Sequence, residues 1–194
     1  MKILKVEDTL KSIFETLQVV VEELKKGEKF ILVDFSNLRS KGCKTDTVGV
    51  TSGVVSFISV YDTGIAPVMG EGKVYCILSV NHPEIENFLT TKFQNLLLGV
   101  ILEDTFVDAV RRGDIVNYML VDPFSKNKTW ITMERLTSLL VIGNLIPFRR
   151  EKEELKEMGK IELLNLKNRC PECNGQISLD NSTCLDCGYS SCRG

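Results

Sequence analysis

Two closely spaced cysteine pairs near the end of the chain constrain its folding more than any other feature. Cys170 and Cys173 form one Cys-x-x-Cys pair, and Cys184 and Cys187 form a second pair ten residues later. A two-residue spacer lets both sulfurs of one pair reach the same ion, and four thiolates suit tetrahedral Zn²⁺. We therefore predict a zinc site at these four cysteines. A complete set of four leaves no open coordination position, so the ion should be structural rather than catalytic.

The segment around these cysteines, residues 168–190, resembles a zinc ribbon. This resemblance implies a small module that binds nucleic acid or protein, or that completes a larger fold. Basic side chains near the segment are the candidate phosphate contacts, since lysine and arginine neutralise phosphates. These candidate nucleic-acid-binding residues are Arg149, Arg150, Lys160, Lys167 and Arg169.

Length and composition predict one medium domain with a small appendage. The chain has 194 residues, of which 43% are hydrophobic and 26% charged, as in ordinary globular proteins. We expect an α/β domain over residues 1–165 and the zinc ribbon over residues 166–194. The formal net charge of −2 gives no general attraction to nucleic acid. The N-terminus lacks a secretory pattern, and the longest apolar run, residues 139–146, is too short for a membrane span. With seven cysteines, these features predict a reducing, cytoplasmic location without membrane contact.

Apolar runs that indicate buried strands alternate with helical patterns along the first 165 residues. Strands are expected at 30–34, 74–80 and 115–122, and helices at 8–26, 83–98, 107–112, 132–145 and 149–158. The segment Val48–Tyr61 fits either a strand or a helix, because β-branched residues and a helical apolar face coincide there. The alternation predicts an α/β fold whose mostly parallel sheet carries helices on both faces.

The α/β body also resembles a RecA/KaiC-like ATPase core. Its first apolar strand is followed by a loop with Gly42, Lys44 and Thr45, and a later strand ends at Asp122. The resemblance implies that Lys44 and Thr45 bind a nucleotide and that Asp122 is linked to its metal. The loop lacks the glycines of a working phosphate loop. The resemblance therefore implies a degenerate core that has lost ATP hydrolysis, and an ordinary polar loop is the alternative.

Other polar residues leave structural and functional interpretations open. Asp34 and Asp122 each end an apolar strand, where a carboxylate either faces a ligand crevice or starts a turn. His82 is the only histidine, and its place beside Asn81 and Pro83 favours helix capping over catalysis. Because no catalytic dyad can be assembled from these residues, we expect no enzyme activity.

These patterns together predict a non-catalytic regulatory factor. Its zinc ribbon would dock on a nucleoprotein partner, such as a ribosome, an RNA or a transcription complex. The alternative function is a degenerate RecA/KaiC-like nucleotide sensor or weak ATPase. A third hypothesis is a homodimer in which the ribbon completes an interface.

Overall fold

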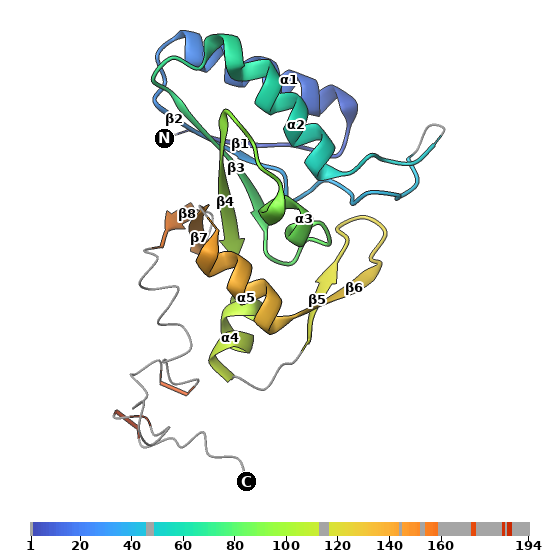
Figure 1. Cartoon of the computed structure of the whole chain (residues 1–194), viewed down its shortest axis with the longest axis vertical. Coiled ribbons are helices and arrows are strands. Elements are labelled where there is room, and N and C mark those ends of the chain that lie inside the picture. Colours follow the sequence, from blue (N-terminus) through green and yellow to red (C-terminus); the bar gives the residue numbers. More distant parts are fainter. Residues whose placement is uncertain are drawn as a thin grey trace.

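A computed structural model describes residues 2–45, 49–112, 117–143, 145–151 and 154–158, together with residues 172, 173, 184, 186 and 187. Helices and strands alternate through most of this range (Figure 1). In chain order they are β1 (Lys2–Lys5), α1 (Leu10–Lys25), β2 (Phe30–Asp34), α2 (Val54–Ile65), a short 3-10 helix (Ala66–Val68), β3 (Lys73–Ser79), α3 (Ile85–Thr90), β4 (Leu96–Leu102), α4 (Asp104–Arg112), β5 (Asn117–Val121), β6 (Lys128–Thr132), α5 (Met133–Ile142), β7 (Leu145–Glu151) and β8 (Glu154–Glu157).

The main sheet has the strand order β1-β2-β3-β4-β7-β8. The first five strands are mutually parallel, and β8 runs antiparallel to β7. The predicted α/β fold with a mostly parallel sheet is therefore confirmed. The five parallel strands lie in the sheet in the same order as in the chain. Every crossover connection therefore adds its next strand on the same side of the preceding one. Because such crossovers are right-handed, their helices collect on one face.

Two separate apolar cores show this one-sided arrangement. The larger core receives buried side chains from the strands and from all five α-helices, among them Ile13, Ile58, Phe88, Phe106 and Leu136. The buried residues of the second core come from strands alone: Leu32, Ile77, Ile101, Phe148 and Leu155. Within the described residues the helices thus share one face, and the prediction of helices on both faces is wrong. Helices on both faces require a reversal of strand order, which this sheet lacks.

The sheet is curled around the second core. Strands β2 and β7 are separated by β3 and β4, and three strand spacings span about 14 Å in a flat sheet. Nevertheless Arg150 Nη2 of β7 lies 3.6 Å from Asp34 Oδ2 of β2. Leu155 of β8 likewise joins Leu32 of β2 in one cluster. The strand-only core therefore fills the concave side of a half-barrel.

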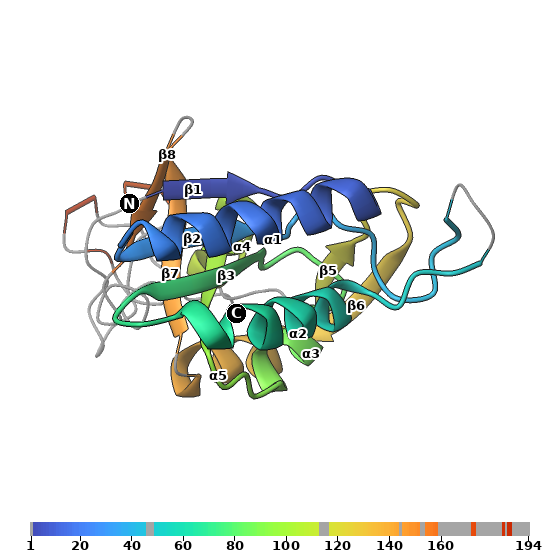
Figure 2. The same cartoon turned by 90° about the horizontal axis from the view of Figure 1, so that it is seen from above.

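Helices α1 and α2 lie side by side on the convex face (Figure 2). Thr9 starts α1 by accepting a hydrogen bond from Ser12 N at 3.0 Å, and α1 ends before Gly27, which has a φ of +87°. This confirms the helix predicted over residues 8–26. The ambiguous segment Val48–Tyr61 becomes helical from Val54, in α2. In the part of the chain that the structure describes, no helix combines the length and apolar character needed to cross a membrane.

One predicted helix ends early because of a distant carboxylate. The helix expected over residues 83–98 is limited to α3, and β4 already begins at Leu96. Asp62 of α2 accepts hydrogen bonds from the backbone N–H groups of Gln94 (3.0 Å), Asn95 (2.7 Å) and Leu96 (3.0 Å). These three bonds hold the chain in an extended entry to β4. Asp62 is more than thirty residues away, so local periodicity gives no sign of it.

Two further segments differ from their predicted structures. In the segment 149–158, predicted as a charged helix, residues 149–151 instead belong to β7 and residues 154–157 to β8, with Arg150 opposite Leu155. Their charges do satisfy helical spacing, but pairing with β4 and burial of Phe148 and Leu155 favour strands. The strand predicted at 115–122 forms as β5 (Asn117–Val121), but it pairs with β6 in a separate antiparallel hairpin and not in the main sheet. The sequence pattern over residues 161–166 fits a short strand or a linker, and these residues lie outside the described ones.

Candidate functional site

Polar side chains occupy the carboxyl ends of four parallel strands, on the concave side of the half-barrel. Asp34 ends β2, Ser79 ends β3, Glu103 follows β4 and Arg150 lies near the end of β7. We call these four residues the mouth. Each lies two positions beyond a member of the strand-only core, so the strand period of two turns it to the same side. The mouth is the polar layer above that apolar core, which is where barrels of parallel strands carry their active sites.

The mouth residues contact one another across the strands. Ser79 Oγ donates a hydrogen bond to Glu103 Oε1 at 2.9 Å, and Arg150 pairs with Asp34 at 3.6 Å. Ser36 N donates to Asp34 Oδ1 at 3.0 Å, and Ser36 Oγ accepts from Ser79 N at 2.8 Å. The side chain of Asp34 is only 6% exposed, whereas that of Arg150 is 33% exposed. The mouth thus offers two carboxylates, a hydroxyl and one partly accessible guanidinium.

A loop beside the mouth is held by carboxylates from three other segments. The backbone N–H groups of three consecutive residues, 39 to 41, each donate to a different carboxylate. The first donates to Asp8 Oδ1 (3.0 Å), the second to Asp122 Oδ2 (2.7 Å) and the third to Glu84 Oε1. We call residues 38–43 the strap. Consecutive backbone N–H groups of this kind can bind an anion, but here they already donate hydrogen bonds to the carboxylates of Asp8, Asp122 and Glu84.

Asp122 connects the strap to the β5–β6 hairpin and is fully buried. Its Oδ2 accepts hydrogen bonds from Ser40 N (2.7 Å), Ser40 Oγ (2.6 Å) and the Cys43 thiol (3.5 Å). Its Oδ1 accepts from Phe124 N (3.0 Å), Ser125 N (2.7 Å) and Ser125 Oγ (3.0 Å) within the hairpin. Burial raises the pKa of Asp122, but the hydrogen bonds from Ser40 and Ser125 outweigh it, so the pKa lies below its ordinary value.

Glu84 and His82 hold the other end of the strap from the β3–α3 connection. Glu84 accepts the backbone N–H groups of Val54 (3.2 Å) and Val55 (3.3 Å) at the start of α2. Gly53 precedes that helix with a φ of +93°, and a Cβ there would approach Glu84 Oε2 to 2.8 Å. His82 Nδ1 accepts from Glu84 N at 3.1 Å, so its Nε2 carries the proton donated to Leu38 O at 2.8 Å.

His82 acts as a buried structural residue. It is 2% exposed, and burial lowers the pKa of its imidazole. Both ring nitrogens are engaged by the backbone, one by Glu84 and the other by Leu38. The neutral ring therefore joins the start of α3 to the strap, in line with a structural role for this residue.

The predicted nucleotide loop does not form a phosphate cradle. Lys44 pairs with Val50 in an isolated antiparallel bridge, and Thr45 N and Oγ1 both donate to Gly49 O, at 3.2 and 3.3 Å. The strap amides that precede these residues donate to carboxylates, which would repel a phosphate. Asp122 does lie next to this loop, but its carboxylate accepts hydrogen bonds from the strap and from its own hairpin. Within the described residues, Lys44 and Thr45 thus pair with residues 50 and 49, whereas Asp122 binds the strap that precedes them.

Of the candidate nucleic-acid contacts, two arginines form ion pairs with carboxylates of the same chain, and the other three residues lie outside the described ones. Arg149 Nη2 pairs with Asp104 Oδ1 at 2.7 Å, and Arg150 pairs with Asp34 within the mouth. Phosphate binding by either arginine would compete with these internal carboxylates. The remaining candidates, Lys160, Lys167 and Arg169, lie outside the described residues.

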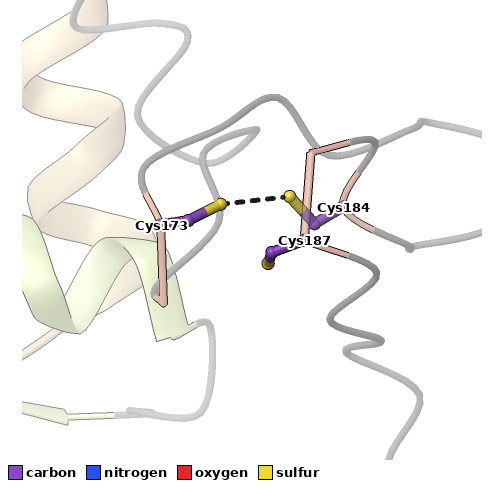
Figure 3. A group of neighbouring side chains, drawn as sticks. All are labelled: Cys173, Cys184 and Cys187. Carbon is purple, nitrogen blue, oxygen red and sulfur yellow. Dashed lines mark hydrogen bonds between the residues drawn. The ribbon is translucent and has the colours of Figure 1, made fainter.

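Three of the four predicted zinc ligands lie together (Figure 3). The Sγ atoms of Cys173, Cys184 and Cys187 all lie within 4.8 Å of one another, and those of Cys173 and Cys184 are 3.4 Å apart. Asp186 N donates to Cys184 Sγ at 3.4 Å. Backbone N–H groups of Cys187 and Asp186 lower the pKa of Cys184 to about 7, against the opposing effect of burial. Cys170 lies outside the described residues.

Comparison with known proteins points to one family. Residues 2–162 match the family described as the ribonucleotide reductase barrel domain. The chain is 36% identical over 134 residues to the vitamin B12-dependent ribonucleoside-diphosphate reductase of Mycobacterium tuberculosis, which covers 62% of this chain and 19% of that protein. Identity is 33% over 137 residues with the vitamin B12-dependent ribonucleoside-diphosphate reductase of Thermoplasma acidophilum, covering 64% and 17%. It is 30% over 144 residues with the ribonucleoside-diphosphate reductase NrdEB subunit alpha of Bacillus subtilis, covering 66% and 13%. The chain thus spans less than a fifth of the length of these relatives.

These matches correct the interpretation of the chain as a whole. The body is similar to ribonucleotide reductases, so its resemblance to a RecA/KaiC-like ATPase is wrong. The match also overturns the identification of the protein through a zinc-ribbon family. The relatives are enzymes by name, which contradicts both the expected non-catalytic factor docking on a nucleoprotein and the expected lack of enzyme activity.

The sequence interpretation found only part of the mouth and strap. It singled out Asp34 and Asp122 as strand-ending carboxylates and Arg150 as a phosphate contact, but it gave no role to Glu84 or Glu103. The available signal was position alone, since Glu103 directly follows the residues that become β4. The short strand β1 escaped detection because four residues of alternating burial give too little pattern.

Proposed function

Because the chain belongs to the ribonucleotide reductase barrel-domain family, we propose that it takes part in the reduction of ribonucleoside diphosphates. The observation that carries this proposal is the match over residues 2–162, with relatives that are all named as ribonucleoside-diphosphate reductases. The chain supplies one section of a catalytic barrel and works together with the remaining sections of such an enzyme. The curled sheet and its polar mouth support this assignment.

The mouth is the proposed contact surface for the ribose. Carboxylates accept hydrogen bonds from hydroxyl groups, and Asp34 and Glu103 face the same concave side from the ends of β2 and β4, with β3 between them. Ser79 orients Glu103 through the 2.9 Å hydrogen bond. Arg150 is the accessible cation of the group and is placed to meet a diphosphate oxygen after exchanging its contact with Asp34.

The name of two relatives includes vitamin B12, but the described residues do not fit a histidine-ligated form of that cofactor. His82 is the only histidine of the chain. It is buried, and both ring nitrogens are engaged by the backbone. It offers no imidazole ligand to cobalt, so we derive no step through this cofactor. The chain's own mouth residues are the ones assigned here to substrate binding.

Binding of ribonucleoside diphosphates tests the proposal directly. Thermal unfolding of the full chain should shift upward with millimolar CDP, ADP, GDP or UDP, and less with the corresponding nucleosides, since a ligand of the folded state stabilises it. Glu103→Gln should reduce the shift. Asp108→Asn, which neutralises a half-exposed carboxylate on α4 that pairs with Arg111 outside the mouth, is the matched control and should keep it. If no diphosphate raises the melting temperature, and no deoxynucleotide forms when the remaining sections of a family reductase and a dithiol reductant are added, the proposal fails.

The cysteine cluster is a proposed structural zinc site of the same protein. Three converging cysteine sulfurs are, as thiolates, ligands that zinc prefers, and the N–H···S hydrogen bond from Asp186 to Cys184 would stabilise one thiolate. Cys170 is the proposed fourth ligand. Mass spectrometry of the intact purified chain should find one zinc ion. Cys184→Ser should lose it, whereas Cys43→Ser, in the strap, should retain it. A parent chain purified from zinc-supplemented medium without bound metal would refute the site.

A further inference from the structure

The strap and the β5–β6 hairpin share one carboxylate whose two oxygens serve different segments. Oδ2 of Asp122 accepts three hydrogen bonds from the strap, from Ser40 N, Ser40 Oγ and the Cys43 thiol. Oδ1 accepts three from the hairpin turn, from Phe124 N, Ser125 N and Ser125 Oγ. From this division we infer that Asp122 is a latch that holds the strap closed against the hairpin.

The other two carboxylates of the strap have a different relation to it. Asp8 holds residue 39 through its backbone and through an ion pair with the Arg39 side chain, and Glu84 holds residue 41 while also binding the start of α2. Both belong to connections within the main sheet and its helices. Asp122 alone among the three comes from the hairpin, which pairs with no strand of the main sheet in the described residues. The hairpin is itself fixed to the body, because Val121 N donates to Asn81 O at 3.0 Å and Tyr118, Leu120 and Ile131 lie in the larger core. Opening of the latch therefore moves the strap and leaves the main sheet intact.

A second contact supports the same closed state. The Arg39 guanidinium lies 4.7 Å from the centre of the Phe124 ring, so the strap also stacks on the hairpin turn. Phe124 is 51% exposed, which shows that the stacked surface is at the rim and not in the core. Opening of the latch would uncover the Cys43 thiol, while the backbone on either side stays paired with Thr51, through Gly42 N to Thr51 O at 3.0 Å and Thr51 N to Cys43 O at 2.9 Å. Cys43 is half-buried in the closed state, with its sulfur 3.5 Å from Ser40 Oγ.

The latch depends on a carboxylate having two acceptor oxygens. In Asp122→Asn one oxygen becomes an NH₂ donor, so the side chain can accept from the hairpin or from the strap but not from both. The strap amide or the turn amides then face another donor. Because hydrogen bonds to charged groups are stronger than neutral ones, the opening equilibrium of the strap should rise roughly ten- to a hundredfold.

Alkylation of Cys43 by iodoacetamide in the full chain measures this opening. Mass spectrometry of the peptide with Cys43 gives its rate, and Cys76, which is fully buried in the larger core, reports global unfolding in the same sample. Asp122→Asn should raise the Cys43 rate roughly ten- to a hundredfold and leave Cys76 unreactive. Asp108→Asn is the matched control and should change neither rate, because it neutralises a half-exposed carboxylate on α4 that pairs with Arg111 at 3.8 Å, away from the strap and the hairpin turn.

An Asp122→Asn chain that keeps Cys76 protected and alkylates Cys43 at the parent rate overturns the inference. If Asp122→Asn unfolds, Cys76 reacts together with Cys43, and Ser40→Ala then decides. That variant removes one strap-side hydroxyl and leaves the carboxylate in place. A faster Cys43 with protected Cys76 in Ser40→Ala supports the latch, and an unchanged Cys43 refutes it. The test does not depend on the proposed enzymatic function.

Discussion

Replacement of Gly99 by alanine tests whether the sheet curls around the strand-only core. Gly99 lies in the middle of β4, and a Cβ there would come within 2.7 Å of Phe148 Cε2 and overlap the Cγ2 methyl of Ile77. Both neighbours are buried in the strand-only core, so the ring and the methyl must shift together. Overpacking of this kind costs about 1–3 kcal/mol of unfolding free energy. In an open sheet the same change would instead stabilise by roughly 0.5–1 kcal/mol, because glycine weakens a strand interior.

The sign of the effect therefore reports the tertiary packing. We expect Gly99→Ala to lower the urea midpoint and to reduce the melting temperature by about 2–4 °C for each kcal/mol lost. Gly64→Ala, in helix α2, is the matched control, because its Cβ would meet only the flexible end of Leu17 at 3.2 Å. Alanine is the better helix former, so this control should be neutral or stabilising. A Gly99→Ala chain as stable as the parent would refute the curled packing.

The remaining predictions concern charge and metal. The free energy of unfolding should fall as the pH drops below about 4, because hydrogen bonding holds the pKa of Asp122 below its value in the unfolded chain. The ionised carboxylate stabilises the fold above that unfolded pKa, and this stabilisation is lost on acidification. Urea midpoints measured from pH 7 to 2.5 should therefore decline less steeply for Asp122→Asn than for the parent chain. Arg150→Ala should cost about 0.2–1 kcal/mol, since Arg150 is partly solvated, and a double-mutant cycle with Asp34→Asn that finds no coupling would exclude the mouth pair. Zinc removal by a chelator should leave the urea midpoint of the main sheet unchanged, because neither apolar core contains Cys173, Cys184 or Cys187. A lowered midpoint in far-ultraviolet circular dichroism would contradict this.

Local patterns predicted the elements whose burial follows a single period. The helix over residues 8–26 and the strands at 30–34 and 74–80 match α1, β2 and β3 within two residues. The apolar residues of the helix recur with a period of 3.6 residues, and those of the strands form continuous runs. No distant contact overrides these local patterns. The short helix at 107–112 and the helix at 132–145 likewise correspond to α4 and α5. The fold class followed from their alternation.

The functional interpretation failed because the informative residues are scattered. The cysteine pairs are adjacent in sequence and drew attention to zinc and to docking. The mouth draws its residues from four separate strand ends, and the strap depends on carboxylates 31, 43 and 82 positions away. Single carboxylates at strand ends are common, so spacing alone could not distinguish Glu84 or Asp122 from turn residues. The family was identified from the similarity to ribonucleotide reductases and could not be identified from these residues.

By itself, the sequence determined the alternation of strands and helices and the paired cysteines, since both depend on neighbours within a few residues. The tertiary structure decided the direction in which the strands add to the sheet, and with it the gathering of the helices on one face. It also placed the charged residues after Phe148 in β7 and β8, because β7 pairs with β4 and Leu155 of β8 is buried in the strand-only core. The Arg150–Asp34 contact of the mouth exists only after this curling, because it joins strands that β3 and β4 separate. The latch exists only after the hairpin meets the strap, 82 positions away in the sequence.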